Sequence, residues 1–545
     1  MAKSKLLSSL RQAYNIAHIS IKSGIPTDEI IDTFAFKTTR RRFLYGGLAV
    51  ASALSTASFN YRQEAIAKTT SKVLIVGGGI AGLTAGYRLQ QAGVPVDIIE
   101  ATSSLGGRIR TMYNSLGTDI PAEMGGEFID SGHKNLLGLA KELGLKMVDL
   151  QTSDKGLETE LWYFDNRKIA QKEIIDWFVP LAEKIERDLG AIGDGDINYR
   201  VASLDAKKFD RLSITEYLET VSIEPLLKQM LVFAYTTEYG REASEQSCLN
   251  LLFLIGTQTD KFQLYGESDE RYQIAGGNEQ IIQRLAKLLN NFIQTQTVLE
   301  SIRTLSDGRY RVSWRSGLQT FTRTYERILL TLPFTALRQV ATNKVNLPPI
   351  KRRAIAQLGY GNGAKLITSY SKRLWREKYQ SNAAIFTDLE FQSTWESSRY
   401  ISGSQGLITN FTGGKYSVSL GTISPESQAK TLLSQLDKIF PGISNVRQTS
   451  QAIRAYWLGE RYFQGSYSCY LVGQWTSIAG AEKERVGNLF FAGEHCSVEA
   501  QGYMEGGCAS GEEAAKEILQ DLGVISKLMQ ETLQCNVSKT KIPTL

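Results

Sequence analysis

The sequence predicts an α/β fold in which distant parts of the chain meet in one parallel sheet and an α+β domain is inserted between them. An apolar run followed by a glycine-rich turn lies at residues 73–82, and a second apolar run ending in glycine and acid lies at 486–494. Alternating strand patterns occupy roughly residues 308–331 between them. An apolar run that leads into a turn and a helix indicates a buried parallel strand.

The composition is that of a large globular protein. The chain has 545 residues, of which 42% are hydrophobic and 22% charged. This is enough apolar material for about three domains or large subdomains. It excludes disorder throughout, a collagen-like chain and a small disulfide scaffold.

Positive charge is concentrated at the amino terminus. The first 67 residues carry nine Lys/Arg and four Asp/Glu of the whole chain's 62 and 56, which leaves a net charge of about +1 for the rest. We therefore expect no nucleic-acid partner and no binding to anionic lipid.

The same segment has the three parts of an export signal. Arg40 and Arg41 stand just before Phe43, an apolar run covers 43–59, and an Ala-x-Ala site ends at Ala67. Paired arginines of this kind resemble the twin-arginine type, which predicts export to the periplasm, the thylakoid lumen or the cell exterior. An uncleaved membrane anchor is the alternative, but the run is short for one, so we expect no stable membrane span in the mature chain.

The first strand–turn–helix unit has the pattern of a dinucleotide-binding fold. Strand 73–76 leads into Gly77, Gly79 and Gly82, and a second strand ends at Glu100. These glycines permit a tight turn, close approach of backbone to a pyrophosphate, and close helix–strand packing. The acid at the end of the second strand can accept ribose hydroxyls and makes NADP an improbable ligand.

Two further stretches change the expected cofactor from NAD to FAD. The run from Glu100 and Ala101 to Gly107 and Arg108 resembles a stretch of flavoproteins in the amine oxidase family. The segment 486–507 resembles the carboxyl-terminal FAD signature of that family, closest to its monoamine and polyamine oxidase branch. Together with the glycine turn, the resemblance implies these cofactor-binding residues: Gly77, Gly79, Ala81, Gly82, Glu100, Ala101, Gly107, Arg108, Gly125, Gly126, Val298, Gly493, Glu494, Gly502, Tyr503 and Met504.

The resemblance implies a discontinuous, Rossmann-like FAD-binding domain with an inserted substrate-binding domain. The expected segments are a signal over 1–67, FAD-binding parts over 68–132, 270–335 and 480–522, substrate-binding parts over 133–269 and 336–479, and a polar tail over 523–545. Helices are expected over 133–143, 171–191, 213–240 and 245–256, and from about residue 503.

The resemblance also implies catalytic residues. Lys365 lies in a strand that resembles the family strand whose lysine holds a water against the flavin; a solvent-facing strand lysine is the alternative. Tyr467 and Tyr503 resemble the paired aromatic residues that form an amine slot on the flavin face, where π-faces orient the nitrogen. Ordinary core tyrosines are the alternative for both.

Three departures from relatives refine this picture. Ser466 stands where covalent monoamine oxidases carry the cysteine bound to flavin, and Cys469 is three residues away, so we expect non-covalent FAD. Phe128 stands where L-amino-acid oxidases of the snake type have a carboxylate-binding arginine. Asp130 matches an acid or histidine of polyamine oxidases and would attract a second ammonium group, unless it caps the helix from residue 133.

The expected reaction is FAD-dependent oxidation of a primary amine or polyamine. Hydride passes to flavin N5, the imine is hydrolysed, and oxygen reoxidises the flavin to give hydrogen peroxide. The partners are a small amine and oxygen, with a homodimer possible. No metal site is expected, since the three histidines have no ligand spacing. The alternatives are an L-amino-acid oxidase that uses another arginine, a flavin desaturase or isomerase, and a flavin-binding protein without activity.

Overall fold

The strands of one parallel sheet come from distant parts of the chain. The structure, a computed structural model, describes residues 72–255 and 268–524. All neighbours in this five-stranded sheet are parallel. Its order is β20 (Leu489–Phe491), β13 (Arg327–Leu330), β1 (Val73–Val76), β2 (Val96–Ile99) and β9 (Ile293–Gln294). This agrees with the α/β fold class, with strands drawn from both ends of the described chain and from its middle.

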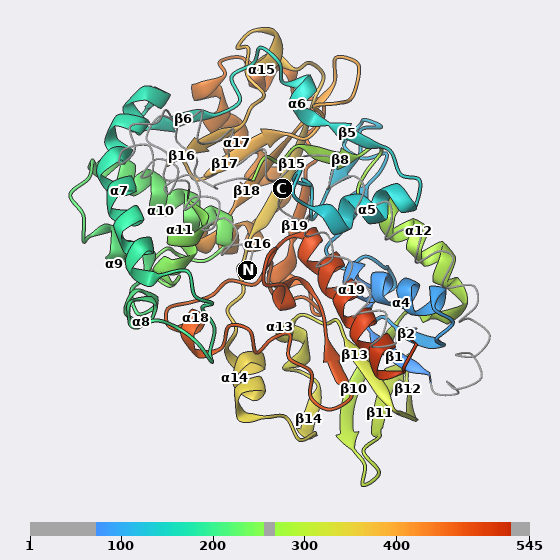
Figure 1. Ribbon diagram of the computed structural model, residues 1–545. Helices are drawn as coiled ribbons and strands as arrows, with labels where there is room; N and C mark the ends of the chain where they lie inside the picture. Colours follow the sequence, from blue (N-terminus) through green and yellow to red (C-terminus); the bar gives the residue numbers. More distant parts are fainter. Residues whose placement is uncertain (1–71, 256–267, 525–545) are drawn as a thin grey trace, which may run out of the picture.

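Four helices share one hydrophobic core with this sheet (Figure 1). They are α4 (Ile80–Gln91), α5 (Lys134–Glu142), α12 (Glu279–Leu289) and α19 (Met504–Asp521), with the turn η1 (Asn290–Phe292) after α12. A Cβ at Gly511 would lie 2.4 Å from the Ala81 carbonyl oxygen, so α19 and α4 can cross this closely only without a side chain there. The predicted helix from about residue 503 is confirmed.

A four-stranded sheet extends from the same region. Its order is β12 (Gln319–Tyr325), β11 (Tyr310–Ser316), β10 (Thr297–Thr304) and β14 (Ala341–Lys344). The alternating pattern at 308–331 therefore supplies an antiparallel hairpin and then β13 of the parallel sheet. Val298, the residue expected beside the adenine, lies in β10.

The third large sheet has seven strands and is mostly antiparallel. Its order is β19 (Ile453–Tyr456), β15 (Ala364–Tyr370), β18 (Gly406–Thr412), β17 (Ser393–Glu396), β16 (Ile385–Thr387), β6 (Leu161–Phe164) and β7 (Arg167–Ile169). Every residue of β15 is buried, including Lys365. Two short ribbons pair β3 (Thr111–Met112) with β4 (Ala122–Glu123), and β5 (Met147–Asp149) with β8 (Tyr272–Ile274).

A helical layer lies at the left of Figure 1. It contains α7 (Gln171–Ile192), α8 (Leu204–Asp210), α9 (Ile214–Leu218), α10 (Pro225–Tyr239) and α11 (Cys248–Leu254). The prediction of one helix over 213–240 is wrong, because the chain breaks between α9 and α10. Pro225 begins α10 and disfavours a helical conformation at the preceding residue, which favours a helix break at this point.

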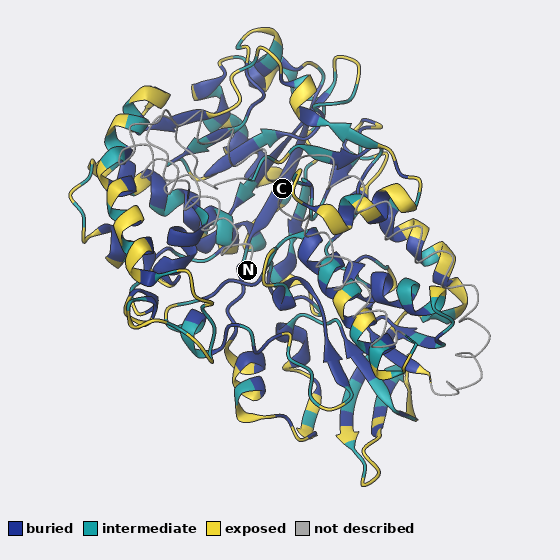
Figure 2. Ribbon diagram, in the orientation of Figure 1, coloured by how far each residue is buried: buried dark blue, intermediate teal, exposed yellow. Residues whose placement is uncertain are grey.

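The remaining elements are short connecting helices and α17. They are α6 (Leu150–Ser153), α13 (Phe334–Leu337), α14 (Pro349–Gln357), α15 (Leu374–Glu377), α16 (Gly414–Thr422), α17 (Pro425–Ile439), α18 (Gln474–Ser477), and the 3₁₀ turns η2 (Ile443–Val446), η3 (Trp457–Gly459) and η4 (Glu494–Cys496). Figure 2 shows the strands of the sheets buried and the outer faces of the peripheral helices exposed. In α7, Ile174, Phe178, Leu181 and Ile185 recur every three or four residues on its buried face.

The predicted export signal over 1–67 and the tail from residue 525 onward lie outside the described residues. Within residues 72–255 and 268–524, no helix is long and apolar enough to cross a membrane. The same part of the chain contains no cluster of His, Cys, Asp and Glu that could hold a metal ion.

Candidate active site

One cavity of about 1290 Å³ is lined by residues of both the parallel and the seven-stranded sheet. All the site residues expected from the sequence line it except Gly82. Residues separated by about 430 positions, such as Gly77 and Tyr503, therefore face the same space. Sequence motifs at the two ends of the chain meet here as expected.

The glycine turn leaves open space at one position and close contacts at two others. A Cβ at Gly79 would meet nothing within 4 Å, whereas one at Gly77 (φ +116°) would lie 2.4 Å from Thr331 Oγ1. A Cβ at Gly82 would lie 2.1 Å from the Gly77 carbonyl oxygen. Helix α4 begins next to Gly79, and the first amides of a helix have no partner within it. The turn therefore offers N–H groups to an anion in the cavity.

Glu100 is held at the end of β2 by backbone amides. Its Oε2 accepts from Gly78 N at 2.8 Å, and its Oε1 accepts from Thr102 N at 2.8 Å. Each carboxylate oxygen can accept more than one hydrogen bond. The side chain is thus fixed in place beside the cavity with acceptor capacity remaining, as a ribose-binding acid requires.

Arg108 and Glu494 join the two ends of the chain. Arg108 Nη2 lies 3.1 Å from Glu494 Oε1, and Glu494 also accepts from Ser468 Oγ at 2.6 Å and Gly502 N at 2.9 Å. Burial would raise the pKa of Glu494, but Arg108, His495 and Ser468 outweigh burial and hold this pKa below its usual value. Arg108 Nη1 has no hydrogen-bond partner among the described residues, so it can bind an anion in the cavity.

The start of α19 borders the cavity and also stabilises α5. Glu505 accepts from Asn135 N at 3.0 Å and from Leu136 N at 2.7 Å. The amino terminus of α5 is therefore capped by a residue about 370 positions away. The alternative that Asp130 caps this helix is wrong, since no side chain of its own loop does so.

The Lys365 side chain extends from β15 and contacts two carbonyl oxygens and one carboxylate oxygen. Its Nζ donates to Glu127 Oε2 at 2.7 Å, to Gly125 O at 2.8 Å and to Glu123 O at 3.2 Å. Its side chain is 9% exposed. The alternative of a solvent-facing strand lysine is therefore wrong.

Tyr467 and Tyr503 line the same part of the cavity. The Tyr467 hydroxyl donates to the Glu238 backbone oxygen and lies 3.1 Å from Glu238 Oε1. The ring of Tyr467 packs against Gly502, the residue before Tyr503, where a Cβ would come within 2.8 Å. Burial, followed by nearby Glu238, raises the pKa of both hydroxyls well above 10, so both tyrosines are neutral.

Phe128 and Asp130 occupy different environments in the same loop. The Phe128 ring packs edge-on against Trp395, with centroids 5.6 Å apart. Asp130 Oδ2 accepts from Ser268 Oγ at 2.9 Å, and its Oδ1 accepts from the Glu270 amide at 2.9 Å. Both carboxylate oxygens therefore already hold the segment that carries Glu270.

Two further acids, Glu238 and Glu270, face the cavity. Burial raises the pKa of Glu238 to about 7, with Asp130 adding to the rise while Tyr467 lowers it. Desolvation, with Glu238 and Asp130 nearby, raises the pKa of Glu270 to about 8, although Arg399 lowers it. Glu270 is exposed where it lines the cavity, and no described side chain donates a hydrogen bond to its carboxylate. This part of the cavity is therefore acidic.

Comparison with known proteins shows which family the chain belongs to. The sequence model of flavin-containing amine oxidoreductases matches residues 80–519. The chain belongs to this family. It is therefore an FAD-dependent amine oxidoreductase.

Curated relatives and solved structures agree over most of this oxidoreductase. It is 23% identical over 482 residues to flavin-containing amine oxidase A of Sus scrofa, covering 84% of this chain and 86% of the relative. It is 24% identical to amine oxidase B of Cavia porcellus, covering 83% and 87%. Among solved structures it resembles putrescine oxidase bound to putrescine (TM-score 0.69, 18% identity) and cyclohexylamine oxidase from Brevibacterium oxydans IH-35A (0.70, 20%). Each covers 83% of this chain and 99% of the solved chain, which supports the fold.

The residues of this amine oxidoreductase fit FAD on the side of the parallel sheet. The open space at Gly79 allows close approach of a diphosphate, and the first turns of α4 and α19 direct amides toward the cavity. Arg108 Nη1 and His495 Nδ1 are buried without partners among the described residues. These polar atoms match a large ligand that carries phosphates and ring heteroatoms.

Three acids that line the cavity were not expected from the sequence. Glu127 directly precedes Phe128 and follows Gly125 and Gly126, and a charge after two glycines in a largely apolar run could have indicated it. Glu238 follows the apolar and aromatic residues 230–235 of α10, which is another usable signal. Glu270 lies in a polar run with no distinguishing pattern.

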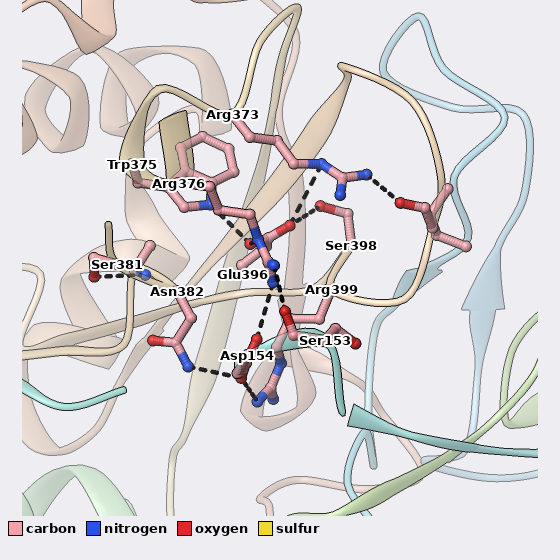
Figure 3. Close-up of polar contacts among 12 residues, drawn as sticks. Ser153, Asp154, Arg373, Trp375, Arg376, Ser381, Asn382, Glu396, Ser398 and Arg399 are labelled. Atoms are coloured by element: carbon pink, nitrogen blue, oxygen red, sulfur yellow. Dashed lines mark hydrogen bonds and ion pairs between the residues drawn. The ribbon is translucent and has the colours of Figure 1, made fainter. Parts of the chain in front are cut away.

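A buried charge network holds one wall of the cavity (Figure 3). Asp154 lies 2.9 Å from Arg376 Nη2 and 3.2 Å from Arg399 Nη1. Arg376 also pairs with the fully buried Glu396, which accepts from Trp375 Nε1 at 2.8 Å. The network fixes Arg399, whose guanidinium carbon lies 4.8 Å from the Phe128 ring centroid. It therefore supports Phe128 from behind the cavity.

Proposed function

We propose that this enzyme oxidises an amine that carries a second positive charge, with non-covalent FAD and oxygen as oxidants. The observation that carries the proposal is the acidic part of the cavity formed by Asp130, Glu238 and Glu270. A desolvated carboxylate without a cation is unfavourable, and a bound ammonium group would relieve this. The names of the relatives, which include flavin-containing amine oxidases, putrescine oxidase and cyclohexylamine oxidase, support an amine substrate.

Glu270 and Glu238 bind the second ammonium group in this proposal, and Asp130 positions Glu270. Both oxygens of Asp130 are engaged by Ser268 and by the Glu270 amide. Glu270 has a left-handed backbone conformation (φ 40°), which is unfavourable for a residue with a side chain. The hydrogen bond from its amide to Asp130 holds this conformation and leaves the Glu270 carboxylate available to a ligand.

The reacting amine lies between the aromatic residues. The π-faces of Tyr467 and Tyr503 orient its nitrogen and favour positive charge as it approaches. Phe128 and Trp395 form an apolar wall that excludes water from the reacting carbon. FAD held by the glycine turn and Arg108 would supply a hydride acceptor for the carbon next to nitrogen and a route for the electrons to oxygen, with hydrogen peroxide as the product. The imine product is then hydrolysed to an aldehyde or ketone.

Ser466 supports non-covalent FAD, since a serine hydroxyl cannot form the thioether that a cysteine provides. Cys469 is buried, its Sγ accepts from Asn250 Nδ2 at 3.7 Å, and it is not among the residues that line the cavity. Denaturing the protein with acid should release all of its flavin into the supernatant. Flavin that stays with the pelleted protein would refute this part of the proposal.

A pair of substrates tests the main proposal, because putrescine and butylamine differ only in the second ammonium group. We expect kcat/KM to be about 10- to 100-fold higher for putrescine, which corresponds to about 1.4–2.7 kcal/mol for one desolvated charge contact. Peroxide formation and anaerobic loss of flavin colour are the measurements. Equal rates would exclude a role for the acidic part of the cavity in selecting the substrate.

An L-amino-acid oxidase is the second candidate that the sequence leaves open, although Arg399 lies behind Phe128 and outside the cavity lining. Lysine and cadaverine separate the two candidates, since they differ only in the carboxylate. Faster oxidation of lysine would favour the amino-acid oxidase, and faster oxidation of cadaverine would favour the amine oxidase. In a desaturase or isomerase, neither compound would bleach the flavin, and neither would give hydrogen peroxide.

We also propose that residues 1–67 export the folded enzyme through a twin-arginine pathway, on the basis of the sequence pattern alone. Fractionating cells that express the full chain should place the enzyme outside the cytoplasm. The Arg40→Lys/Arg41→Lys variant should stay inside. The same location for both proteins would exclude this signal.

A further inference from the structure

Lys365 and Glu127 form a buried ion pair in the wall of the cavity. Nζ and Oε2 lie 2.7 Å apart, and the side chains are 9% and 3% exposed. Trp395 covers the pair, with its ring centroid 5.3 Å from Nζ. Water screens such a pair only weakly, so removing one partner would leave an uncompensated charge beside the cavity.

Protein oxygens occupy all three N–H donors of the Lys365 ammonium group. They are Glu127 Oε2 at 2.7 Å, Gly125 O at 2.8 Å and Glu123 O at 3.2 Å. A lysine ammonium has three donors and no acceptor. Lys365 could therefore hold a water, as expected from the sequence, only if one of these bonds opened.

Of the acidic groups near Lys365, Glu127 is the one that compensates its positive charge. Burial raises the pKa of Glu123 to about 8, and its oxygens accept from Asn278 N and Thr111 Oγ1, so it is mostly neutral at pH 7. Glu270 and Tyr400 interact with Glu127 only through longer-range electrostatics. Glu127 Oε1 has no hydrogen-bond partner among the described residues. The carboxylate therefore interacts with Lys365 through its other oxygen, Oε2.

We propose that Glu127 is a positioning residue for Lys365, and that the two side chains act as one neutral pair beside the incoming amine. The proposal rests on the proposed function, because its consequence concerns a cationic substrate. Without Glu127, the Lys365 charge would repel an ammonium group in the cavity. Without Lys365, Glu127 would be an unpaired buried acid. Removing both charges should be less harmful than removing either one.

Four variants test this inference: Glu127→Gln, Lys365→Met, the double variant, and Glu127→Asp. We expect Glu127→Gln to raise the KM for putrescine at least about tenfold, with a smaller change in kcat. We expect the double variant to return to within about threefold of the wild-type KM, and Glu127→Asp to recover part of the loss. The exposed pair Lys172–Asp176 provides the control, since Lys172→Met/Asp176→Asn should change none of these values.

Binding of benzyltrimethylammonium, a cation that cannot be oxidised, gives a readout without turnover. Its Kd should rise about tenfold in Glu127→Gln and recover in the double variant. A wild-type KM and Kd in Glu127→Gln, or a double variant as weak as Glu127→Gln, would overturn the inference.

The unfolding temperature of the purified holoenzyme tests the pair independently of amine oxidation. The double variant should unfold at a higher temperature than either single variant. A double variant less stable than both single variants would overturn the inference. A wild-type enzyme that oxidises no amine would instead refute the proposed function, and the order of unfolding temperatures would still decide whether the pair acts as a unit.

Discussion

The acids on the two sides of the cavity have opposite surroundings. On the side of the parallel sheet, Glu100 is held by backbone amides, and Glu494 is paired with Arg108, which helps to lower its pKa. On the side of the seven-stranded sheet, desolvation raises the pKa of Glu238 and Glu270. The acids of the first side are paired or held by amides, whereas the two acids of the second side have no cationic hydrogen-bond partner among the described residues.

This difference shows how one cavity can serve two kinds of ligand. Fixed amides and a partly unpaired arginine suit a resident anionic cofactor, which needs a preformed site. Acids with raised pKa values suit a cation that enters and leaves, because protonation compensates for the missing charge when the cation is absent. Substitutions on each side should therefore have different consequences.

The largest effect is expected on the cofactor side, from Gly82→Ala. Its Cβ would lie 2.1 Å from the Gly77 carbonyl oxygen, so helix and turn must separate. We expect at least about 1–3 kcal/mol lower free energy of unfolding and loss of bound FAD. The control is Gly79→Ala, whose Cβ meets no protein atom within 4 Å; it should fold normally and bind FAD less tightly. Denaturant unfolding and flavin absorbance measure both effects, and equal stability of the two variants would contradict the predicted backbone contact.

A smaller and more selective effect is expected on the amine side, from Glu270→Gln. We expect kcat/KM for putrescine to fall about 10- to 100-fold, while kcat/KM for butylamine and the FAD content stay unchanged. Asp130→Asn should have a weaker effect in the same direction, because Asp130 acts through the Glu270 amide. Steady-state kinetics with both amines is the measurement. A loss shared equally by the two substrates would place Glu270 outside the second-ammonium site.

The smallest effect is a pH dependence that separates the two sides. The folded-state pKa values of Glu238 and Glu270, about 7 and 8, lie above the ordinary value of 4.5. The empty folded protein therefore holds more protons than the unfolded chain between about pH 4.5 and 8, and these groups make its stability fall as pH rises through that range. Putrescine should reverse this trend and release protons when it binds.

Calorimetry in two buffers with different ionisation enthalpies measures this proton release at pH 7. Glu270→Gln should release fewer protons than the wild type, because one of the titrating acids is absent. Binding without proton release in the wild type would show that these acids are already ionised in the empty protein.

The cofactor side could be predicted from the sequence because its signals are local. Gly77, Gly79, Gly82 and Glu100 lie within 24 residues, and the strand–turn–helix unit that they specify does not depend on the rest of the chain. The amine side could be predicted only in part. Phe128, Asp130, Lys365 and both tyrosines were found by resemblance, and all line the cavity, but their chemical roles stay predictions. The break between α9 and α10 was missed although Pro225 indicates it.

The sequence by itself determined the α/β class, the FAD cofactor and the family, because glycine geometry and short apolar runs act over a few residues. Only the tertiary structure decided which charges meet. Glu127, Glu238, Glu270 and Lys365 come from separate parts of the chain, and no spacing in the sequence relates them. Their protonation and pairing depend on burial and on distances of a few ångströms, and both exist only after the chain has folded.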